Sequence, residues 1–221
     1  MRRLWFLIPL LWVSIASAQV GPAPGIQLQD EGTGAGRIQI LNCVGAGVTC
    51  TKSGVTGTAT ISSSGGGITL ATMQATTSGT AKDFTGIPSG TKRITVMFDG
   101  VSTNGTSPLK VQIGDAGGLE ITGYIGHVQA VGSVTAYSDA FLMDQTVTAA
   151  TNLRYGVLTL TLMDSGTNVW TGTGMLANKG SVNTNISTGV KPLTAELDRV
   201  RITTVNETDT FDAGNVNITY E

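Results

Sequence analysis

Hydrophobic and polar residues alternate along much of the chain. Residues 93–98 place isoleucine, valine and phenylalanine at every second position, and residues 155–163 do the same with leucines separated by threonines. A period of two predicts strands with one side in a core. Turn residues recur roughly every 8–12 positions between such segments, which is typical of a sandwich or jelly roll. The expected strands are residues 37–42, 47–51, 57–61, 93–98, 110–113, 119–124, 141–143, 155–163, 168–175, 198–205 and 216–220.

Runs of glycine, proline and serine divide the chain. Residues 21–25 read Gly-Pro-Ala-Pro-Gly, and residues 62–67 are three serines followed by three glycines. Neither run favours a strand or a helix. We therefore expect a linker and a small glycine-rich β module over residues 19–67, followed by a jelly-roll-like antiparallel β-sandwich over residues 68–221. Residues 192–197 are the one stretch with helical character, amounting to a turn or two.

The first 18 residues have the pattern of a cleavable secretory signal peptide. Arg2 and Arg3 precede an apolar run from Leu4 to Ile15, and Ala16-Ser17-Ala18 forms a small-residue cleavage site. The apolar run is shorter than the about 20 residues of a membrane span, although an uncleaved anchor is the alternative. We expect an exported protein, periplasmic or extracellular, with no stable membrane span after cleavage.

The composition fits this interpretation. Charged residues make up 13% of the chain, against ~25% in ordinary soluble domains. The net charge is −2, and beyond the N-terminal residues no lysine or arginine cluster exceeds Lys92-Arg93. A nucleic-acid partner needs a basic face and is therefore not expected. Strand edges with so few charges invite pairing with other chains, so we expect a homo-oligomer.

The two cysteines, Cys43 and Cys50, flank a glycine-rich turn. In an oxidising compartment they could form a disulfide across a hairpin. The alternative is two small buried thiols, because the register across the turn cannot be read from the sequence.

No set of residues points to catalysis. The single histidine, His127, lies in no nucleophile motif, and a turn or surface position explains it better than a catalytic triad. The carboxylate pairs Asp139/Asp144 and Glu207/Asp209 resemble loop residues more than a glycosidase pair. A calcium loop over residues 209–212 lacks the ordered spacing of an EF-hand. We expect no enzyme, no metal and no cofactor.

Three aromatic residues are the candidates for a binding surface: Tyr124, Tyr137 and Trp170. Exposed rings on loops or sheet faces stack on sugars and anchor interfaces. For Trp170, a place in the sandwich core opposite Leu160 is the favoured alternative.

Several segments resemble those of tailed-bacteriophage tail-fibre and other virion structural proteins: residues 83–98, 100–105, 111–114 and 216–221, together with the glycine-rich module at 41–49. The resemblance implies a β-sandwich head on a virion appendage, commonly trimeric, that contacts the host surface. It carries over no functional residues, and the export signal departs from tail proteins that assemble in the host cytoplasm.

The leading hypothesis is a non-enzymatic phage virion or phage-encoded surface protein of the tail-fibre type. Its partners would be a host surface polysaccharide or protein, or other virion proteins. The alternatives are a secreted bacterial carbohydrate-binding or adhesin domain and, ranked last, a hydrolase on a jelly-roll scaffold. Fold by itself does not choose among them.

Overall fold

The computed structural model describes residues 26–30, 33–38, 48–53, 56–61, 67–130, 132–145, 149–180 and 183–221. The chain divides into two compact units, Met1–Ser64 and Gly65–Glu221, and each is described by itself. The described residues contain strands and turns but no helix. The expected signal peptide lies outside the described residues.

The described residues of the first unit form two antiparallel hairpins. One pairs β1 (Ile26–Asp30) with β2 (Thr33–Ile38), and the other pairs β3 (Val48–Ser53) with β4 (Thr56–Ile61). Cys50 lies on β3 and is disulfide-bonded, whereas Cys43 lies outside the described residues. The pairing of Cys50 with Cys43 across a hairpin stays a prediction.

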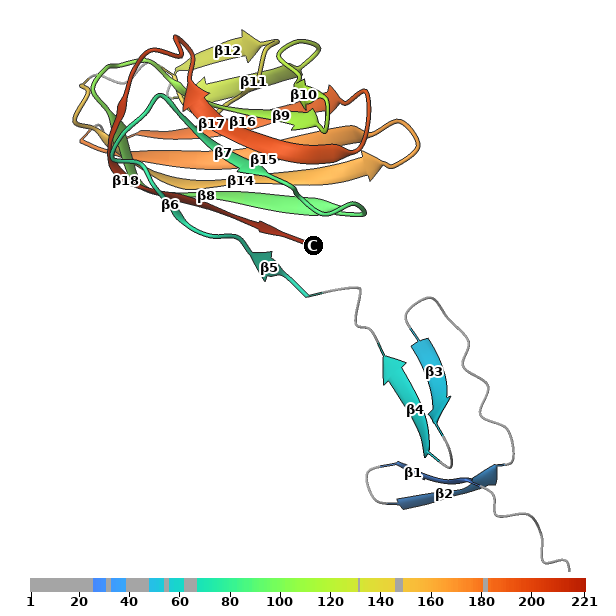
Figure 1. The fold of residues 1–221 in the computed structure, drawn as a ribbon. Coiled ribbons are helices and arrows are strands. Elements are labelled where there is room, and N and C mark those ends of the chain that lie inside the picture. The colour runs from blue at the N-terminus through green and yellow to red at the C-terminus, as the bar shows by residue number, and fades with distance from the viewer. Residues whose placement is uncertain are drawn as a thin grey trace, which may run out of the picture. The chain divides into compact units, whose positions relative to one another are not determined.

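The second unit is an antiparallel β-sandwich, which confirms the predicted all-β fold. Its larger sheet has the strand order β12 (Ser133–Tyr137), β11 (Ile125–Ala130), β16 (Asn183–Pro192), β15 (Val169–Lys179), β14 (Leu153–Asp164), β8 (Arg93–Thr103), β18 (Phe211–Tyr220) and β5 (Thr69–Leu70), with β6 (Gln74–Ala75) also on β18. The smaller sheet has the order β10 (Gly118–Leu119), β9 (Leu109–Asp115), β17 (Leu197–Thr204) and β7 (Ala81–Thr85), with β13 (Phe141–Leu142) also on β9. The two sheets form the two layers of this domain (Figure 1).

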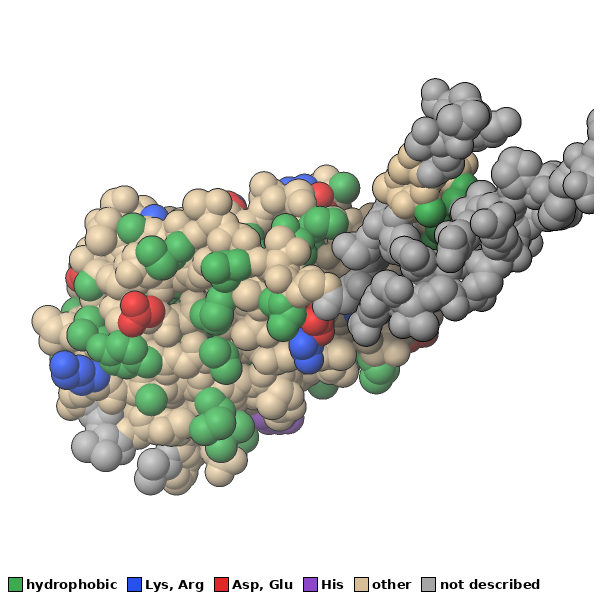
Figure 2. Space-filling model, turned by 90° about the horizontal axis from the view of Figure 1, so that it is seen from below, with side chains coloured by type: hydrophobic (Ala, Val, Ile, Leu, Met, Phe, Trp, Pro, Cys, Tyr) green, Lys and Arg blue, Asp and Glu red, His purple; other side chains and the backbone are tan. Residues whose placement is uncertain are grey.

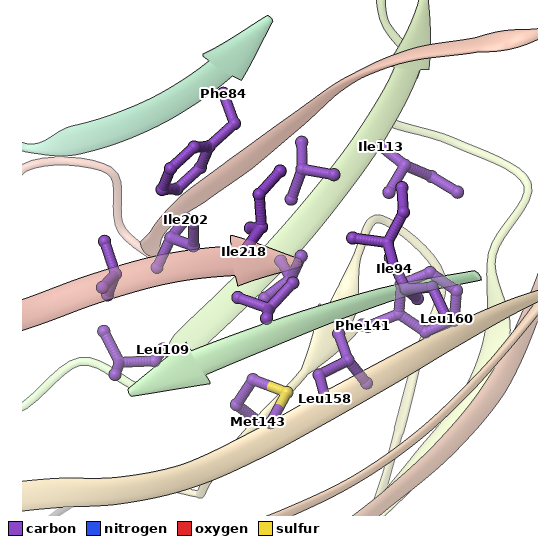
Figure 3. Close-up of a cluster of buried hydrophobic side chains, with 14 of the residues drawn as sticks. Phe84, Ile94, Leu109, Ile113, Phe141, Met143, Leu158, Leu160, Ile202 and Ile218 are labelled. Atoms are coloured by element: carbon purple, nitrogen blue, oxygen red, sulfur yellow. The ribbon is translucent and has the colours of Figure 1, made fainter. Parts of the chain in front are cut away.

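Aliphatic side chains from both layers fill the space between the sheets. Leu158 and Leu160 of β14 and Ile94 of β8 face Ile113 and Ile202 of the smaller sheet, and all five are fully buried (Figure 3). Burying each of these side chains contributes about 1.5–3 kcal/mol. The hydrophobic residues at every second position of these strands are therefore the ones that point into the core.

Glycines form a strip along the inner side of the larger sheet. Gly172, Gly189 and Gly126 are neighbours on β15, β16 and β11, in one cross-strand row. A Cβ atom at Gly172 would lie 2.7 Å from the ring of Phe141, and one at Gly126 would lie 2.5 Å from the ring of Tyr137. The missing side chains therefore make room for two aromatic rings.

Two expected elements differ in the structure. Residues 119–124 contribute only the end of β10, and Gly123, with a positive φ of 77°, lies in the turn that leads into β11. Residues 194–195 form a bend and no helix, and Leu193 and Leu197 on either side of this bend are both buried. The pattern also did not predict the strands β1, β5, β6, β7, β11, β12 and β16.

The first strands of the sandwich lie along its last one. Leu70 of β5 pairs with Thr219, and Gln74 of β6 pairs with Val216. The Thr76 N–H donates to the carbonyl of Gly214 over 2.9 Å. Residues 69–76 therefore border the larger sheet beside β18.

Candidate binding surface

Two of the three candidate aromatic residues belong to the core. Tyr124 is 2% exposed, accepts a hydrogen bond from Ile113 N (2.8 Å) and meets the Phe141 ring edge-to-face with centroids 5.2 Å apart. Burial raises its pKa above the ordinary value. Trp170 is 1% exposed and packs in the same core. Tyr124 is therefore not the exposed ring that was considered for a binding surface, because large apolar rings gain most from burial, and Trp170 has the core position that was favoured for it.

Tyr137 is half-buried and holds an edge of the larger sheet. Its ring lies over the space left by Gly126 and Gly189. Its hydroxyl donates to the carbonyl of Thr188 over 2.9 Å and lies 3.2 Å from the hydroxyl of Ser187. Burial raises its pKa. The three rings thus do not form one exposed platform.

The residues considered for catalysis are dispersed. His127 is exposed on β11, between Ala136 and Thr188 in the sheet. Lys110 Nζ forms ion pairs with one carboxylate from each candidate pair, Asp139 (3.1 Å) and Glu207 (2.8 Å). Both carboxylates are at least half exposed, which fits a partly solvated ion-pair network.

Asp144 takes part in a buried ion pair. Its carboxylate accepts from Arg154 Nε (2.7 Å) and from the Leu109 N–H (2.6 Å), and both charged side chains are fully buried. Burial raises the pKa of Asp144 to about 6, while Arg154 and the Leu109 N–H act in the opposite direction. This pair joins β9 and β14 across the interior and is not open to a substrate.

Asp209, the first residue of the segment considered for calcium, forms hydrogen bonds within the chain. It accepts hydrogen bonds from Ser107 N (3.0 Å) and from Asn206 Nδ2 (2.6 Å). In the part of the chain that the structure describes, no group of three or more His, Cys, Asp or Glu is placed to hold a metal ion.

The outer side of the smaller sheet is covered by charge pairs. Arg201 of β17 binds Asp83 of β7 through two hydrogen bonds of 2.7 Å each. Arg199 pairs with Asp198 (3.0 Å), and Lys110 of β9 holds the two carboxylates described above. This side of the sandwich is therefore polar and electrostatically satisfied.

The outer side of the larger sheet has a different chemistry. We call it the outer face, and it has two cross-strand rows. In the aliphatic row, Met97 of β8, Val157 of β14, Met175 of β15 and Ile186 of β16 are direct cross-strand neighbours, and Gln129 and Val134 extend it to β11 and β12. In the threonine row, one residue stands on each of five adjacent strands: Thr219, Thr95, Thr159, Thr173 and Thr188.

Charged side chains lie at the ends of this face. Arg93 at the start of β8 forms an ion pair with Glu221 (2.5 Å), and Asp99 and Lys179 lie towards the opposite end. Figure 2 views the domain from this side and shows scattered hydrophobic side chains on an otherwise mostly uncharged surface. Because neighbouring strands are about 4.8 Å apart, the rows present methyl, thioether and hydroxyl groups at regular spacing.

An open groove lies between β7 and the segment 70–74. Its volume is about 550 Å³, and Phe84, Ile87, Ile218 and Tyr220 are among its lining residues. The Gln74 side chain donates to the carbonyl of Asp83 over 2.6 Å. The groove combines apolar side chains with backbone groups of an edge strand.

These features define a β-sandwich with one charge-paired side and one broad, nearly uncharged side. Comparison of the chain with protein-family models, with curated proteins and with solved structures finds no match. Among the described residues, no helix has the length and apolar character needed to cross a membrane.

Proposed function

We propose that this protein is a non-enzymatic, exported surface-contact protein of the phage virion or tail-fibre type. The observation that carries the proposal is the outer face of the larger sheet. Met175 is 53% exposed in the centre of the aliphatic row, and its row neighbours Val157 and Ile186 are 42% and 48% exposed. Exposed apolar side chains that are neighbours on adjacent strands form a candidate interaction surface.

The chemistry of the face suits an uncharged, extended partner. Methyl and thioether groups pack against the apolar faces of sugar rings or of a protein, while threonine hydroxyls donate and accept hydrogen bonds. Each contact is shallow, so firm attachment comes from many copies acting together. The proposed partners are a host surface polysaccharide or protein, and the protein acts as a homo-oligomer.

A matched pair of lysine variants tests the role of the face. Thr173→Lys puts a charge in the middle of the threonine row, and Thr208→Lys puts the same charge in the exposed loop after β17, away from the outer face and from the groove. Adsorption of labelled protein to a panel of bacterial cells and purified surface polysaccharides is measured. Thr173→Lys should weaken adsorption roughly tenfold, which corresponds to about 1.4 kcal/mol, and Thr208→Lys should leave it unchanged.

Two results would contradict the proposal. One is a wild-type protein that adsorbs to no cell or polysaccharide in the panel. The other is equal adsorption by Thr173→Lys and the wild type.

The groove beside β7 supports a second candidate, a secreted carbohydrate-binding domain. The Tyr220 ring and the polar groups of Gln74 and Asp83 line it, which is the combination that small-molecule sites use. This candidate predicts that Tyr220→Ala abolishes binding of soluble oligosaccharides in titration calorimetry while Thr173→Lys does not. The opposite pattern would favour the outer face.

A further inference from the structure

Strand β12 is an unprotected edge of the larger sheet. It pairs with β11 on one side, and within the described residues no strand lies on its other side. Its sequence, Ser-Val-Thr-Ala-Tyr, contains no charged residue and no proline. Val134 is 60% exposed. In natural proteins a lysine, a proline, a bulge or a covering loop commonly prevents an edge strand from pairing with another chain. Strand β12 has no charged residue, no proline and no bulge.

This edge is held in place for pairing. Five residue pairs from Gly126–Tyr137 to Ala130–Ser133 join β11 and β12 without a shift in register. The Tyr137 ring in the glycine strip and its hydrogen bond to Thr188 fasten the end of the strand to the sheet. A preformed strand loses little conformational entropy when another strand binds it.

The contacts of Gln145 show which backbone groups of β12 are free. Gln145 Nε2 donates to the carbonyls of both Val128 (3.4 Å) and Ser133 (3.3 Å), which places these carbonyls between the two strands. Backbone groups alternate in direction along an antiparallel strand. The N–H and C=O groups of Val134 and Ala136 therefore point to the free edge.

We propose that two copies of this chain join edge to edge through β12, antiparallel, about a twofold axis at Thr135. In this register Val134 lies opposite Ala136 of the second copy, and Ala136 lies opposite its Val134. Each of these pairs exchanges two backbone hydrogen bonds, so every free edge group of Val134 and Ala136 is used. No like charges meet, because β12 carries none.

A second copy fits this edge better than an unrelated strand. A twofold contact uses the same surface on both partners, and the spacing of the free groups around Thr135 is symmetric. The pairing also places the two outer faces side by side in one continuous sheet, since Val134 belongs to the aliphatic row. The inference concerns assembly alone and does not depend on what the outer face binds. It gives a pairwise contact in place of the trimer implied by the phage resemblance.

Proline and cysteine variants test the contact. Ala136→Pro removes an N–H that points to the free edge and makes no bond to β11, a position that proline tolerates on an edge strand. Thr135→Cys places two thiols opposite each other across the axis, in a non-hydrogen-bonded pair with Cα atoms about 4.5 Å apart, within disulfide range. Thr173→Cys, on the outer face, is the matched control.

Sedimentation velocity over a concentration range up to millimolar should show a wild-type dimer and an Ala136→Pro monomer with an unchanged circular dichroism spectrum. Under mild oxidation, Thr135→Cys should form a covalent dimer and Thr173→Cys should not. A wild-type monomer throughout the range overturns the inference. So does a folded Ala136→Pro variant that still dimerises, or a dimeric Thr135→Cys variant without the cross-link. Failure of the proposed function would instead appear as loss of adsorption in a protein that still dimerises.

Discussion

Replacing Gly172 with alanine tests whether the glycine strip is a steric requirement. The new Cβ atom would lie 2.7 and 2.8 Å from two ring carbons of Phe141 and 3.2 Å from a methyl carbon of Leu160. Carbon atoms pack best about 3.5–4.0 Å apart. Because Phe141 and Leu160 are fully buried, neither can move away without disturbing the core.

The change in stability expected for Gly172→Ala is the result of two opposing effects. Adding a methyl group to a well-packed core costs about 1–3 kcal/mol, and here the overlap lies between two buried elements, towards the upper end. Alanine also restricts the unfolded chain, which stabilises the protein by about 0.4–1 kcal/mol where the backbone conformation allows it. We expect Gly172→Ala to be destabilised by about 1–2 kcal/mol, which lowers the Tm by roughly 2–8 °C in a domain of this size.

Urea unfolding monitored by circular dichroism measures this loss. Gly166→Ala is the control, since its Cβ atom would lie 3.4 Å from the Asp164 carboxylate in an exposed turn, and its stability should match the wild type. Phe141→Leu provides room, so the double variant with Gly172→Ala should be more stable than the sum of the two single losses predicts. Additive losses, or a Gly172→Ala protein as stable as Gly166→Ala, would show that the ring contact does not set the requirement.

Two further predictions concern ion pairs. Arg154→Met leaves Asp144 buried without its counter-charge, which costs about 3–5 kcal/mol of stability at pH 7. Because burial raises the pKa of Asp144 to about 6, its carboxyl binds a proton in mild acid and no longer needs a counter-charge. Urea unfolding at pH 4.5 should therefore show a smaller loss of stability for Arg154→Met than at pH 7. Burial alone would raise the pKa of Glu120, but hydrogen bonds from Lys191 and Thr194 hold it below its ordinary value of 4.5. The stability that Glu120 contributes is therefore complete above that value and is lost as the pH falls through the lowered pKa. Thermal unfolding across this range should show a shallower decline for Glu120→Gln than for the wild type, and parallel curves would count against the assignment.

The sequence predicts the centre of the sandwich better than its ends. In β14, Leu158 and Leu160 alternate with threonines and both are buried, because the strand has core on one side and solvent on the other. Strand β16 gave no such signal. Its inward positions include Asn185, Ser187 and Lys191, which are buried and polar. Hydrogen bonds, such as that of Lys191 to Pro192 O, satisfy these groups, and hydrophobic periodicity cannot detect them.

The outer face could be predicted only in part. The threonines of β14 were recognised as polar positions of a strand, but their meaning depends on which residues lie beside them on β8 and β15. The register between strands decides which residues are neighbours, and the sequence of one strand does not determine that register. Conversely, Tyr124 and Trp170 were candidates by residue type, and only the three-dimensional packing shows that they are enclosed.

The way residues 69–76 lie along β18 has a mechanical consequence. Tension applied to the chain ahead of Thr69 acts first on the pairs with Thr219 and Tyr220 and then on the Ala71 and Thr76 hydrogen bonds, one after another. A pull directed away from the sheet edge breaks these bonds one at a time, as in unzipping. At about 3.3–3.6 Å per extended residue, the released residues 69–76 form a link that spans roughly 25–30 Å. The long central strands of the larger sheet keep their pairing while this border segment comes away.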